Sequence, residues 1–438
     1  MNQSKNAEGI TSADNRDQEK RTPRMPWLIL TLPLLMVGLI LLFSPNFKTA
    51  DRMRMAPLGG DFLQEWVGAK MFEMGEEQQL YDLKYVQAFQ HDSAVVGFQW
   101  PENSYFPMVY PPFYYASLQS LSSFSYPVAS KIWAVLSALA LSISGLLLYQ
   151  FYAPCRRVLG ICFVAALFFV PVLNCFNMGQ KSTFLLLILS GTFVLLHNKR
   201  PFLAGIVFGL IIFKPHFGIV IGLTMLLKGQ WKFALGALAV VSIAFGYSWL
   251  GHGRLVSDYF LVISEMSDYV QTGGYRLSDA HSLWGAAQLS FGWLQASVVK
   301  TIAVVLSLIV IGLLWRVMAG KIETDSPRFT RQFAAMVFAM VLLSPHFYGY
   351  DLTILLLPML LIVSTVAPGT WRVNVFDLSL GFVLLGIFVL AGLFAQIAGV
   401  IPVQPSIILM AAALTLLGLR PTSPGARLAD SVVSGPGR

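Results

Sequence analysis

Long runs of apolar residues, separated by short polar links, recur along almost the whole chain. A helix needs about 17 to 25 mostly apolar residues to cross roughly 30 Å of hydrocarbon, and it satisfies its backbone hydrogen bonds internally. The pattern therefore predicts an all-α polytopic membrane protein with about twelve spanning helices. The segments are 27–44, 128–152, 158–177, 180–197, 201–213, 215–227, 232–250, 295–315, 331–344, 350–366, 376–398 and 403–419.

The basic residues of the links predict the orientation, because cytoplasmic links of membrane proteins carry an excess of Lys and Arg. Residues 1–26 are polar and are expected to form a disordered cytoplasmic tail. If they lie inside, every second link is also basic. These links hold Arg156, Arg157, Lys199, Arg200, Lys228, Lys232, Arg316, Lys321, Arg328, Arg331, Arg372 and Arg420. We therefore expect a spanning domain over 27–420, a second disordered tail over 421–438, and both termini in the cytoplasm.

Two short apolar runs allow more than one interpretation. The runs 201–213 and 215–227 could form one interrupted helix, but that arrangement would move the basic link at 316–331 outside. The distribution of positive charge therefore favours two crossings. The run 111–121 is too short to span and is predicted to be a dipping or re-entrant helix.

This topology leaves two substantial outer loops, about 45–110 and 251–282, whereas the inner links are short. The inner links have no room for a folded nucleotide-binding domain, and no GxxxxGK(S/T) phosphate loop occurs. Of the 438 residues, 56% are hydrophobic and 12% are charged. The net charge of +8 is interpreted as a topology signal, so no nucleic acid is expected as a partner. The three cysteines are expected to be small core residues without a disulfide or metal framework.

The sharpest local feature is the sequence GGDF at 59–62, just past the first spanning segment. Two glycines allow a tight turn beside the carboxylate of Asp61. The following stretch has helical periodicity, and it predicts an amphipathic helix lying on the outer surface of the membrane. Asp61 suits the N-cap of that helix as well as it suits a functional site.

Further polar residues interrupt the apolar runs on the outer side. Gln180 and Lys181 follow Gly179 in a break that either serves a polar ligand or hydrates the bend. Lys214 and His216 stand between two apolar runs, where a lysine is costly and usually faces a cavity or pairs with an anion. Snorkelling of Lys214 to the interface is the alternative. A lipid phosphate is an anion that an ammonium and an imidazolium can both bind.

Four more residues are expected on the same face. Tyr110 precedes two prolines, which can end an extended approach and start a helix. His281 opens the apolar stretch after the second outer loop, and His346 and Asp351 lie in the last outer link. His281 and Asp351 could instead be helix caps. Polar groups of mixed sign around a membrane-level cavity are typical of a binding site.

In these motifs the chain resembles glycosyltransferase family 87, within the GT-C class of enzymes that use polyprenyl-phosphate sugars. The resemblance runs from about residue 61 to residue 358. It lies in GGDF with Trp66, Ala69, Leu80, Tyr81 and Asp82, in Tyr110-Pro111-Pro112, in Gly179-Gln180, in Ala204-Gly205 with Lys214-Pro215, and in Ser344-Pro345-His346. It implies a GT-C-type fold and a mannosyltransferase-like enzyme that uses a polyprenyl-monophosphate donor at the outer face of the cell inner (cytoplasmic) membrane.

Carried over by position, the resemblance implies that Asp61 is the catalytic aspartate and that Lys214 and His346 surround the donor phosphate. With His216 as a third phosphate ligand, Asp61 is expected to act as a general base in a displacement with inversion. The further pocket candidates are Tyr110, Gln180, Lys181, His281 and Asp351. The expected partners are a lipid-linked sugar donor, a glycolipid or polysaccharide acceptor and membrane lipids, with no cofactor and no required metal.

A transporter or flippase of a lipid-linked glycan is the alternative, because it would hold phosphate with the same cations. Transporters often contain internal repeats with paired broken helices. The chain has no second copy of the break at Lys214 or of the GGDF sequence, which favours the enzyme.

Overall fold

The computed structural model describes residues 25–43, 57, 59–151, 156–272, 276–365 and 375–419. This part of the chain is helical, and its only β-type pairing is an isolated bridge between Ala280 and Tyr348. The predicted tails lie outside the described residues, apart from Met25 and Pro26, which begin the first helix. The start of the loop at 45–110 and the basic links around Arg372 and Arg420 also lie outside them.

The helices follow one another through the spanning domain, with short 3-10 helices, labelled η, between them. In chain order they are α2 (Met25–Phe43), α3 (Phe62–Met74), η2 (Glu77–Gln79), α4 (Leu83–His91), α5 (Ser93–Val96), α6 (Pro112–Ser117), α7 (Gln119–Ser122), α8 (Tyr126–Phe151), α9 (Arg156–Ala166), α10 (Val170–Asn177), α11 (Ser182–His197), α12 (Pro201–Gly209), η4 (Leu210–Phe213), α13 (Pro215–Leu227), α14 (Trp231–Thr272), η5 (Leu277–Asp279), α15 (Leu283–Phe291), α16 (Ala296–Val317), α17 (Pro327–Leu343), η6 (Gly349–Leu355), α18 (Leu356–Thr365), α19 (Val375–Leu390), α20 (Phe394–Val400) and α21 (Pro405–Leu419).

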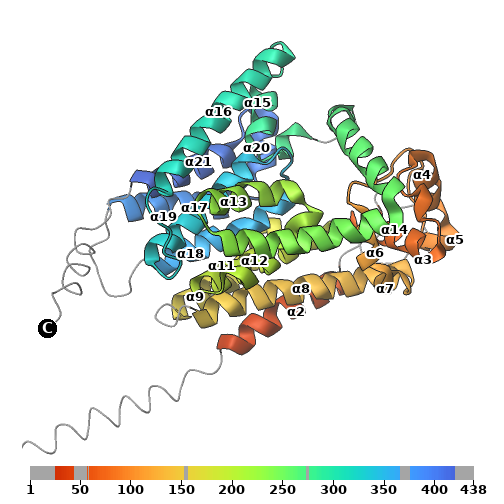
Figure 1. Ribbon diagram of the computed structural model, residues 1–438, viewed down its shortest axis with the longest axis horizontal. Coiled ribbons are helices and arrows are strands. Elements are labelled where there is room, and N and C mark those ends of the chain that lie inside the picture. The colour runs from red at the N-terminus through yellow and green to blue at the C-terminus, as the bar shows by residue number, and fades with distance from the viewer. Residues whose placement is uncertain are drawn as a thin grey trace, which may run out of the picture.

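Two groups of helices make up the domain. In the first, α8 packs against α2 and α11, and α12 packs against α11 and α14. In the second, α17 packs against α13, α16, α18 and α21. Figure 1 shows α2, α8, α12 and the first part of α14 side by side, with α3 to α7 gathered at one end of them. The groups meet where η6 packs against α10 and α11, and this contact positions the site described below.

Every predicted spanning segment falls on one helix or on two consecutive helices, but the count of twelve spans is not confirmed. Within the described residues, four helices are long and apolar enough to cross a membrane. They contain Pro26–Phe43, Tyr126–Phe151, Trp231–Ser264 and Ala296–Val317. The number rises to six if each of two bent pairs forms one span, and the remaining apolar helices are shorter.

The predicted span at 376–398 is not one continuous helix, because α19 and α20 meet at an angle of 83°. At this bend Gly392 lies so close to the start of α10 that a Cβ atom would stand 2.9 Å from the side chain of Val170. The segment at 158–177 is also divided, since α9 and α10 are bent by 48°. Hydropathy identified both apolar segments but not the turns inside them.

The predicted outer loop at 251–282 is largely helical, because α14 continues to Thr272 beyond a single non-helical residue, His252. Leu255 is fully buried in the same apolar cluster as Phe62, and the ring of Tyr259 lies 6.2 Å from that of Tyr81. Figure 1 shows the second part of α14 beginning near α4 and turning away from the line of the first part. Packing against α3 and its neighbours therefore supports a helix that the polar residues of this segment did not predict.

The helix α3 does not lie on a surface as predicted, since Phe62–Ala69 are all buried. Its aromatic residues pack against those of α8, with the ring of Phe62 stacked 4.8 Å from that of Trp133. The amphipathic helix of this region is α4, which buries Val86 and Phe89. The GGDF sequence therefore leads into a buried helix.

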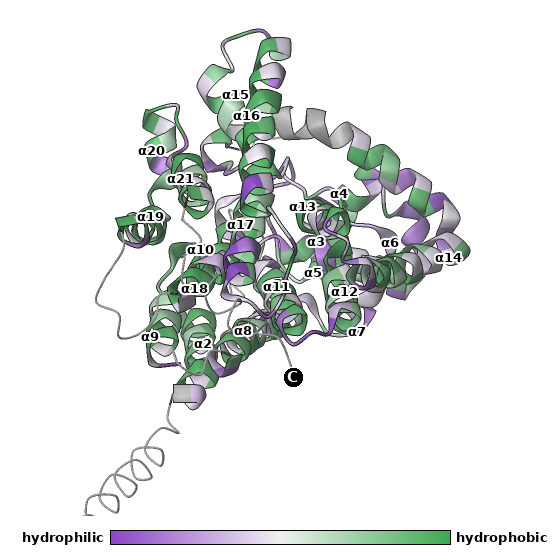
Figure 2. Ribbon diagram, turned by 60° about the vertical axis from the view of Figure 1, so that its left-hand side comes forward, coloured by the Kyte–Doolittle hydropathy of each residue, from purple (hydrophilic) through white to green (hydrophobic). Residues whose placement is uncertain are grey.

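Large apolar side chains cover the outer faces of many helices. Exposed leucines, isoleucines and valines occur on α2, α8, α13, α14, α16 and α19. Figure 2 shows apolar residues predominating along these helices. A protein surrounded by water rarely exposes contiguous apolar surface of this extent, whereas lipid is a suitable solvent for it.

Candidate active site

Two glycine turns interlock at the start of the site. Gly59 and Gly60 have φ angles of 68° and 63°, and Gly179 has a φ of 60°, so all three use the left-handed region that favours glycine. A Cβ atom on Gly60 would lie 2.6 Å from the backbone of Met178, and one on Gly179 would overlap the carbonyl oxygen of Gly59. Only residues without a side chain allow the two turns to approach this closely.

Asp61 leaves the first turn and is held by the second. Its backbone N–H donates to the carbonyl oxygen of Met178 over 2.9 Å, and its carboxylate accepts a hydrogen bond from the side-chain amide of Gln180. The carboxylate makes no capping hydrogen bond to α3. Asp61 therefore occupies the N-cap position of α3, but its carboxylate is directed to Gln180 and to the site instead of capping the helix.

The environment of Asp61 favours its neutral form. Burial is the main cause that raises the pKa of this carboxyl from 3.8 to about 6, and the charge of Glu65 adds to the effect. The charges of Lys181 and Lys214 and the hydrogen bond from Gln180 act in the opposite direction. A carboxylate with a pKa near neutrality is suited to accept a proton.

After the pair of side chains Asp61 and Gln180, a second pair of side chains lies one helical turn further along α3. Glu65 forms an ion pair with Lys181, and the two residues are only 0% and 1% exposed. The ammonium of Lys181 also stands 4.0 Å from the centre of the Tyr110 ring. Since Gln180 and Lys181 are adjacent, the pairs Asp61–Gln180 and Glu65–Lys181 join α3 to the turn before α11 twice. Sequence reasoning missed Glu65, and its spacing of four residues from Asp61 was the available signal.

Lys214 and Asp351 form a third pair, with 3.1 Å between Nζ and Oδ1. Ser182 donates to the same carboxylate oxygen over 2.7 Å. Lys214 is 7% exposed, so it does not snorkel, and Asp351 lies inside η6 rather than at a cap. The sequence placed both residues at the site, and the structure brings them into contact.

The three predicted histidines lie in different surroundings. His216 packs its ring against Phe217 and is within electrostatic reach of Lys214 and His346. His346 is partly buried after α17, and burial lowers its pKa. His281 is buried, and its Nδ1 lies 2.8 Å from the hydroxyl of Ser406. His281 is not a cap, because Ser282 caps α15 through the N–H of Gly285.

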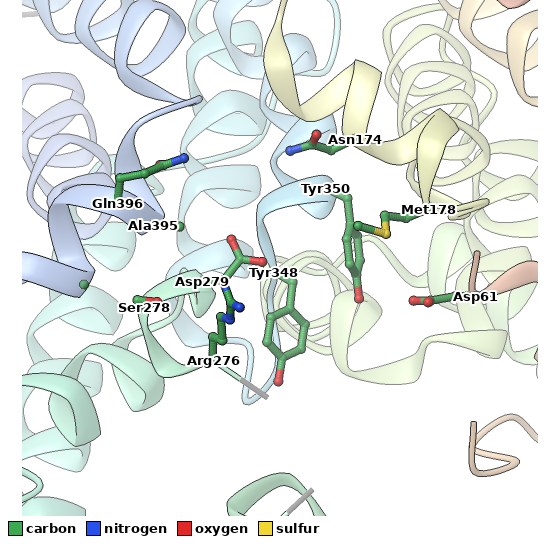
Figure 3. Close-up of a pocket in the computed structure, with 11 residues that line it drawn as sticks. Asp61, Asn174, Met178, Arg276, Ser278, Asp279, Tyr348, Tyr350, Ala395 and Gln396 are labelled. Carbon is green, nitrogen blue, oxygen red and sulfur yellow. The ribbon is translucent and has the colours of Figure 1, made fainter. Parts of the chain in front are cut away.

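A cavity of about 670 Å³ opens beside Asp61. This volume is within the range of about 300 to 1,000 Å³ that is usual for small-molecule sites. Its lining residues are Asp61, Asn174, Met178, Arg276, Ser278, Asp279, Tyr348, Tyr350, Ala395, Gln396 and Gly399. Figure 3 shows Asp61 on one side and Arg276, Ser278 and Asp279 on the other, with the rings of Tyr348 and Tyr350 between them. Of the nine predicted site residues, only Asp61 lines this cavity.

The family model of glycosyltransferase family 87 matches residues 108–345, which is more than half of the 438 residues. The chain belongs to glycosyltransferase family 87. No curated protein and no solved structure matches it. The match contains Tyr110, Gln180, Lys181, Lys214, His216 and His281. Asp61, His346 and Asp351 lie outside it, so the family assignment does not by itself assign their roles.

The chain is therefore a membrane glycosyltransferase, and its cavity contains residues that sequence reasoning missed. Asn174, Arg276 and Gln396 belong to no motif, and they come from three distant segments of the chain. These residues line the same cavity only because η5 and α20 lie close to the end of α10. Within the described residues, no group of three or more His, Cys, Asp or Glu side chains is arranged to hold a metal ion.

An apolar groove of about 530 Å³ is also lined in part by Lys181 in this glycosyltransferase. Its walls come from α6 to α8, α11, η4 and α14. Among its described lining residues, Lys181 is the only one with a charge. The lining residues are Phe113, Tyr114, Ser117, Leu118, Leu121, Trp133, Leu136, Lys181, Phe184, Leu187, Ile188, Leu210, Ile212, Phe213, Val240 and Ala244.

Proposed function

We propose that this glycosyltransferase transfers a hexose, specifically mannose, from a polyprenyl-monophosphate donor to an acceptor hydroxyl. The observation that carries the proposal is the carboxylate of Asp61, which faces the cavity and makes no cap to α3. The reaction takes place at the outer face of the cell inner membrane, with both termini in the cytoplasm. The acceptor is a glycolipid or a polysaccharide.

The apolar groove supports a lipid-linked donor. A prenyl chain is a branched hydrocarbon, and the groove offers leucine, isoleucine and phenylalanine side chains along its length. Burying such a chain contributes roughly 25 cal/mol for each Å² of apolar surface removed from water. With its tail in the groove, the donor extends its polar end toward the cavity that Asp61 lines.

Asp61 is proposed as the general base. As the acceptor oxygen bonds to the anomeric carbon, its proton passes to Asp61, and the bond from that carbon to the phosphate oxygen breaks. The electron pair leaves with the polyprenyl phosphate, so the configuration at the anomeric carbon inverts. Gln180 holds one carboxylate oxygen and directs the other toward the cavity. General-base catalysis of this kind contributes about 10² to 10⁴ in rate.

The roles of Lys214, His216 and His346 at the donor phosphate remain predictions. None of the three lines the cavity, and the charge of Lys214 is already balanced by Asp351. Their positive potential still acts on the site, since the charge of Lys214 contributes to the pKa of Asp61. The proposed reaction uses no cofactor and requires no divalent metal, because a direct displacement needs only a base and a stabilised leaving group.

A transfer assay in proteoliposomes tests the proposal against the flippase alternative. The purified chain is reconstituted with a polyprenyl-phosphate donor that carries radiolabelled mannose, and with a membrane glycolipid fraction as acceptor. The proposal predicts covalent transfer of label to the acceptor. Movement of the intact donor between leaflets, without a labelled product, would support the flippase instead.

A further inference from the structure

Two of the three cations around the site are already neutralised inside the protein. Lys181 is paired with Glu65, and Lys214 is paired with Asp351. All four side chains are buried. Withdrawing either lysine to bind a ligand would leave a buried carboxylate without a counter-ion, which is strongly unfavourable. These lysines therefore shape the potential of the site, and either of them would have to leave its ion pair to contact a phosphate directly.

Arg276 is different. It is exposed, and it is the only basic residue among the described residues that line the cavity beside Asp61. The ion pairs formed within the described part of the chain do not include it. Among the residues that the structure describes, no carboxylate therefore forms an ion pair with its guanidinium. A planar guanidinium can donate two parallel hydrogen bonds to a phosphate group.

We propose that Arg276 binds the phosphate of the lipid-linked donor and stabilises it as the leaving group. The inference rests on the proposed function, and it adds a residue that no motif assigns. In an inverting displacement, the acceptor oxygen arrives on one side of the anomeric carbon as the phosphate departs on the other. The base and the phosphate ligand must then lie on opposite sides of the sugar.

The cavity has this arrangement. Figure 3 shows Asp61 and Arg276 on opposite sides, with the rings of Tyr348 and Tyr350 between them. A hexose lying along these rings would direct its anomeric carbon between carboxylate and guanidinium. As the carbon–oxygen bond breaks, negative charge grows on the phosphate oxygen, and a fixed cation stabilises this charge more in the transition state than in the ground state.

Hydrogen bonds fix the segment that begins at Arg276 to two neighbouring segments of the chain, the one around Gln404 and the one around Phe347. The carbonyl oxygen of Arg276 accepts the N–H of Asp279 over 2.9 Å, and Gln404 donates to the carbonyl oxygen of Ser278 over 2.8 Å. The N–H of His281 donates to the carbonyl oxygen of Phe347 over 2.7 Å. Arg276 is therefore positioned relative to the tyrosines that follow Phe347, as a phosphate ligand requires.

The test compares Arg276→Gln and Arg276→Lys with Arg254→Gln as a matched control. Arg254 is an exposed arginine of α14 that lies outside the cavity lining. Binding of polyprenyl monophosphate, the product that retains the phosphate, is measured with each protein in lipid nanodiscs. We expect Arg276→Gln to weaken binding by about 10- to 100-fold, as for other hydrogen bonds to charged groups. Arg276→Lys should lose less, and Arg254→Gln should bind as the wild type does.

Two results would overturn the assignment. One is equal binding of polyprenyl monophosphate by Arg276→Gln and the wild type. The other is a raised KM for the acceptor with unchanged donor binding, which would place an acceptor group at Arg276. If the wild type binds polyprenyl monophosphate through Arg276 but transfers no sugar, the proposed function fails while the phosphate site stands.

Discussion

The backbone N–H of Asp61 donates to the carbonyl oxygen of Met178 over 2.9 Å, and this bond joins the turn before α3 to the turn before α11. Gln180, two residues after Met178, holds the carboxylate of the same aspartate. The position of Asp61 is therefore set by a second segment of the chain as much as by its own helix. The following predictions depend on this connection.

Adding a methyl group to Gly60 should disrupt the contact. In Gly60→Ala, the Cβ atom would lie 2.6 Å from the Met178 backbone, at a φ of 63°. A strained backbone of this kind costs about 1 to 3 kcal/mol, and the clash adds to it. We expect at least a tenfold loss of transfer activity. Gly75→Ala is the control, because Gly75 also has a positive φ but has open space around it, so activity should be nearly retained.

The pH dependence of kcat/KM should report the ionisation of Asp61. A general base must be deprotonated to act, and the pKa of Asp61 is raised to about 6. Activity should therefore be constant above that pH and fall as the pH decreases through it. Because the hydrogen bond from Gln180 lowers this pKa, Gln180→Leu should move the fall to higher pH. In Asn174→Leu, which changes another amide in the cavity wall, the midpoint should not move.

The buried pair Glu65–Lys181 should show strong coupling in unfolding experiments. Removing one partner leaves an uncompensated buried charge, so Glu65→Leu and Lys181→Met should each destabilise the protein by about 3 to 5 kcal/mol. The double variant should be more stable than either single one. Thermal unfolding in detergent micelles measures the three proteins against the wild type. Additive losses in the double variant would show that the two residues are independent.

Filling the apolar groove should affect donors according to the length of their tail. Ala244 of α14 lines the groove, whereas Leu238 of the same helix is exposed outside it. Ala244→Trp should raise KM for a long-chain polyprenyl donor by roughly tenfold, about 1.4 kcal/mol of lost binding. KM for a short-chain analogue should change little. Leu238→Trp serves as the control, and an equal effect of both substitutions on both donors would argue against the groove as the site of the tail.

The sequence predicted the apolar segments of the fold well, but not their packing. Hydropathy finds the residues that avoid water, and every predicted span falls on one helix or on two consecutive helices. It could not reveal the bend at Gly392, because that glycine is required by contact with Val170 from a distant segment. It also missed the second part of α14, where contacts of Leu255 with the cluster around Phe62 support a helix of mixed polarity.

The sequence predicted some residues of the candidate site and missed others, because it shows local patterns but not contacts between distant segments. Asp61 was identifiable because two glycines and a carboxylate form a local pattern. The partners Glu65–Lys181 and Lys214–Asp351 lie more than a hundred positions apart, and no local pattern connects them. Arg276 stands in a segment without a motif, and only the cavity reveals it.

The most direct test concerns the carboxylate of Asp61. Asp61→Asn keeps the size of the side chain but removes the proton acceptor. Turnover of a mannosyl polyprenyl phosphate donor by reconstituted protein should fall by about 10² to 10⁴, with donor binding and thermal unfolding as in the wild type. Turnover of Asp61→Asn close to that of the wild type would contradict the account.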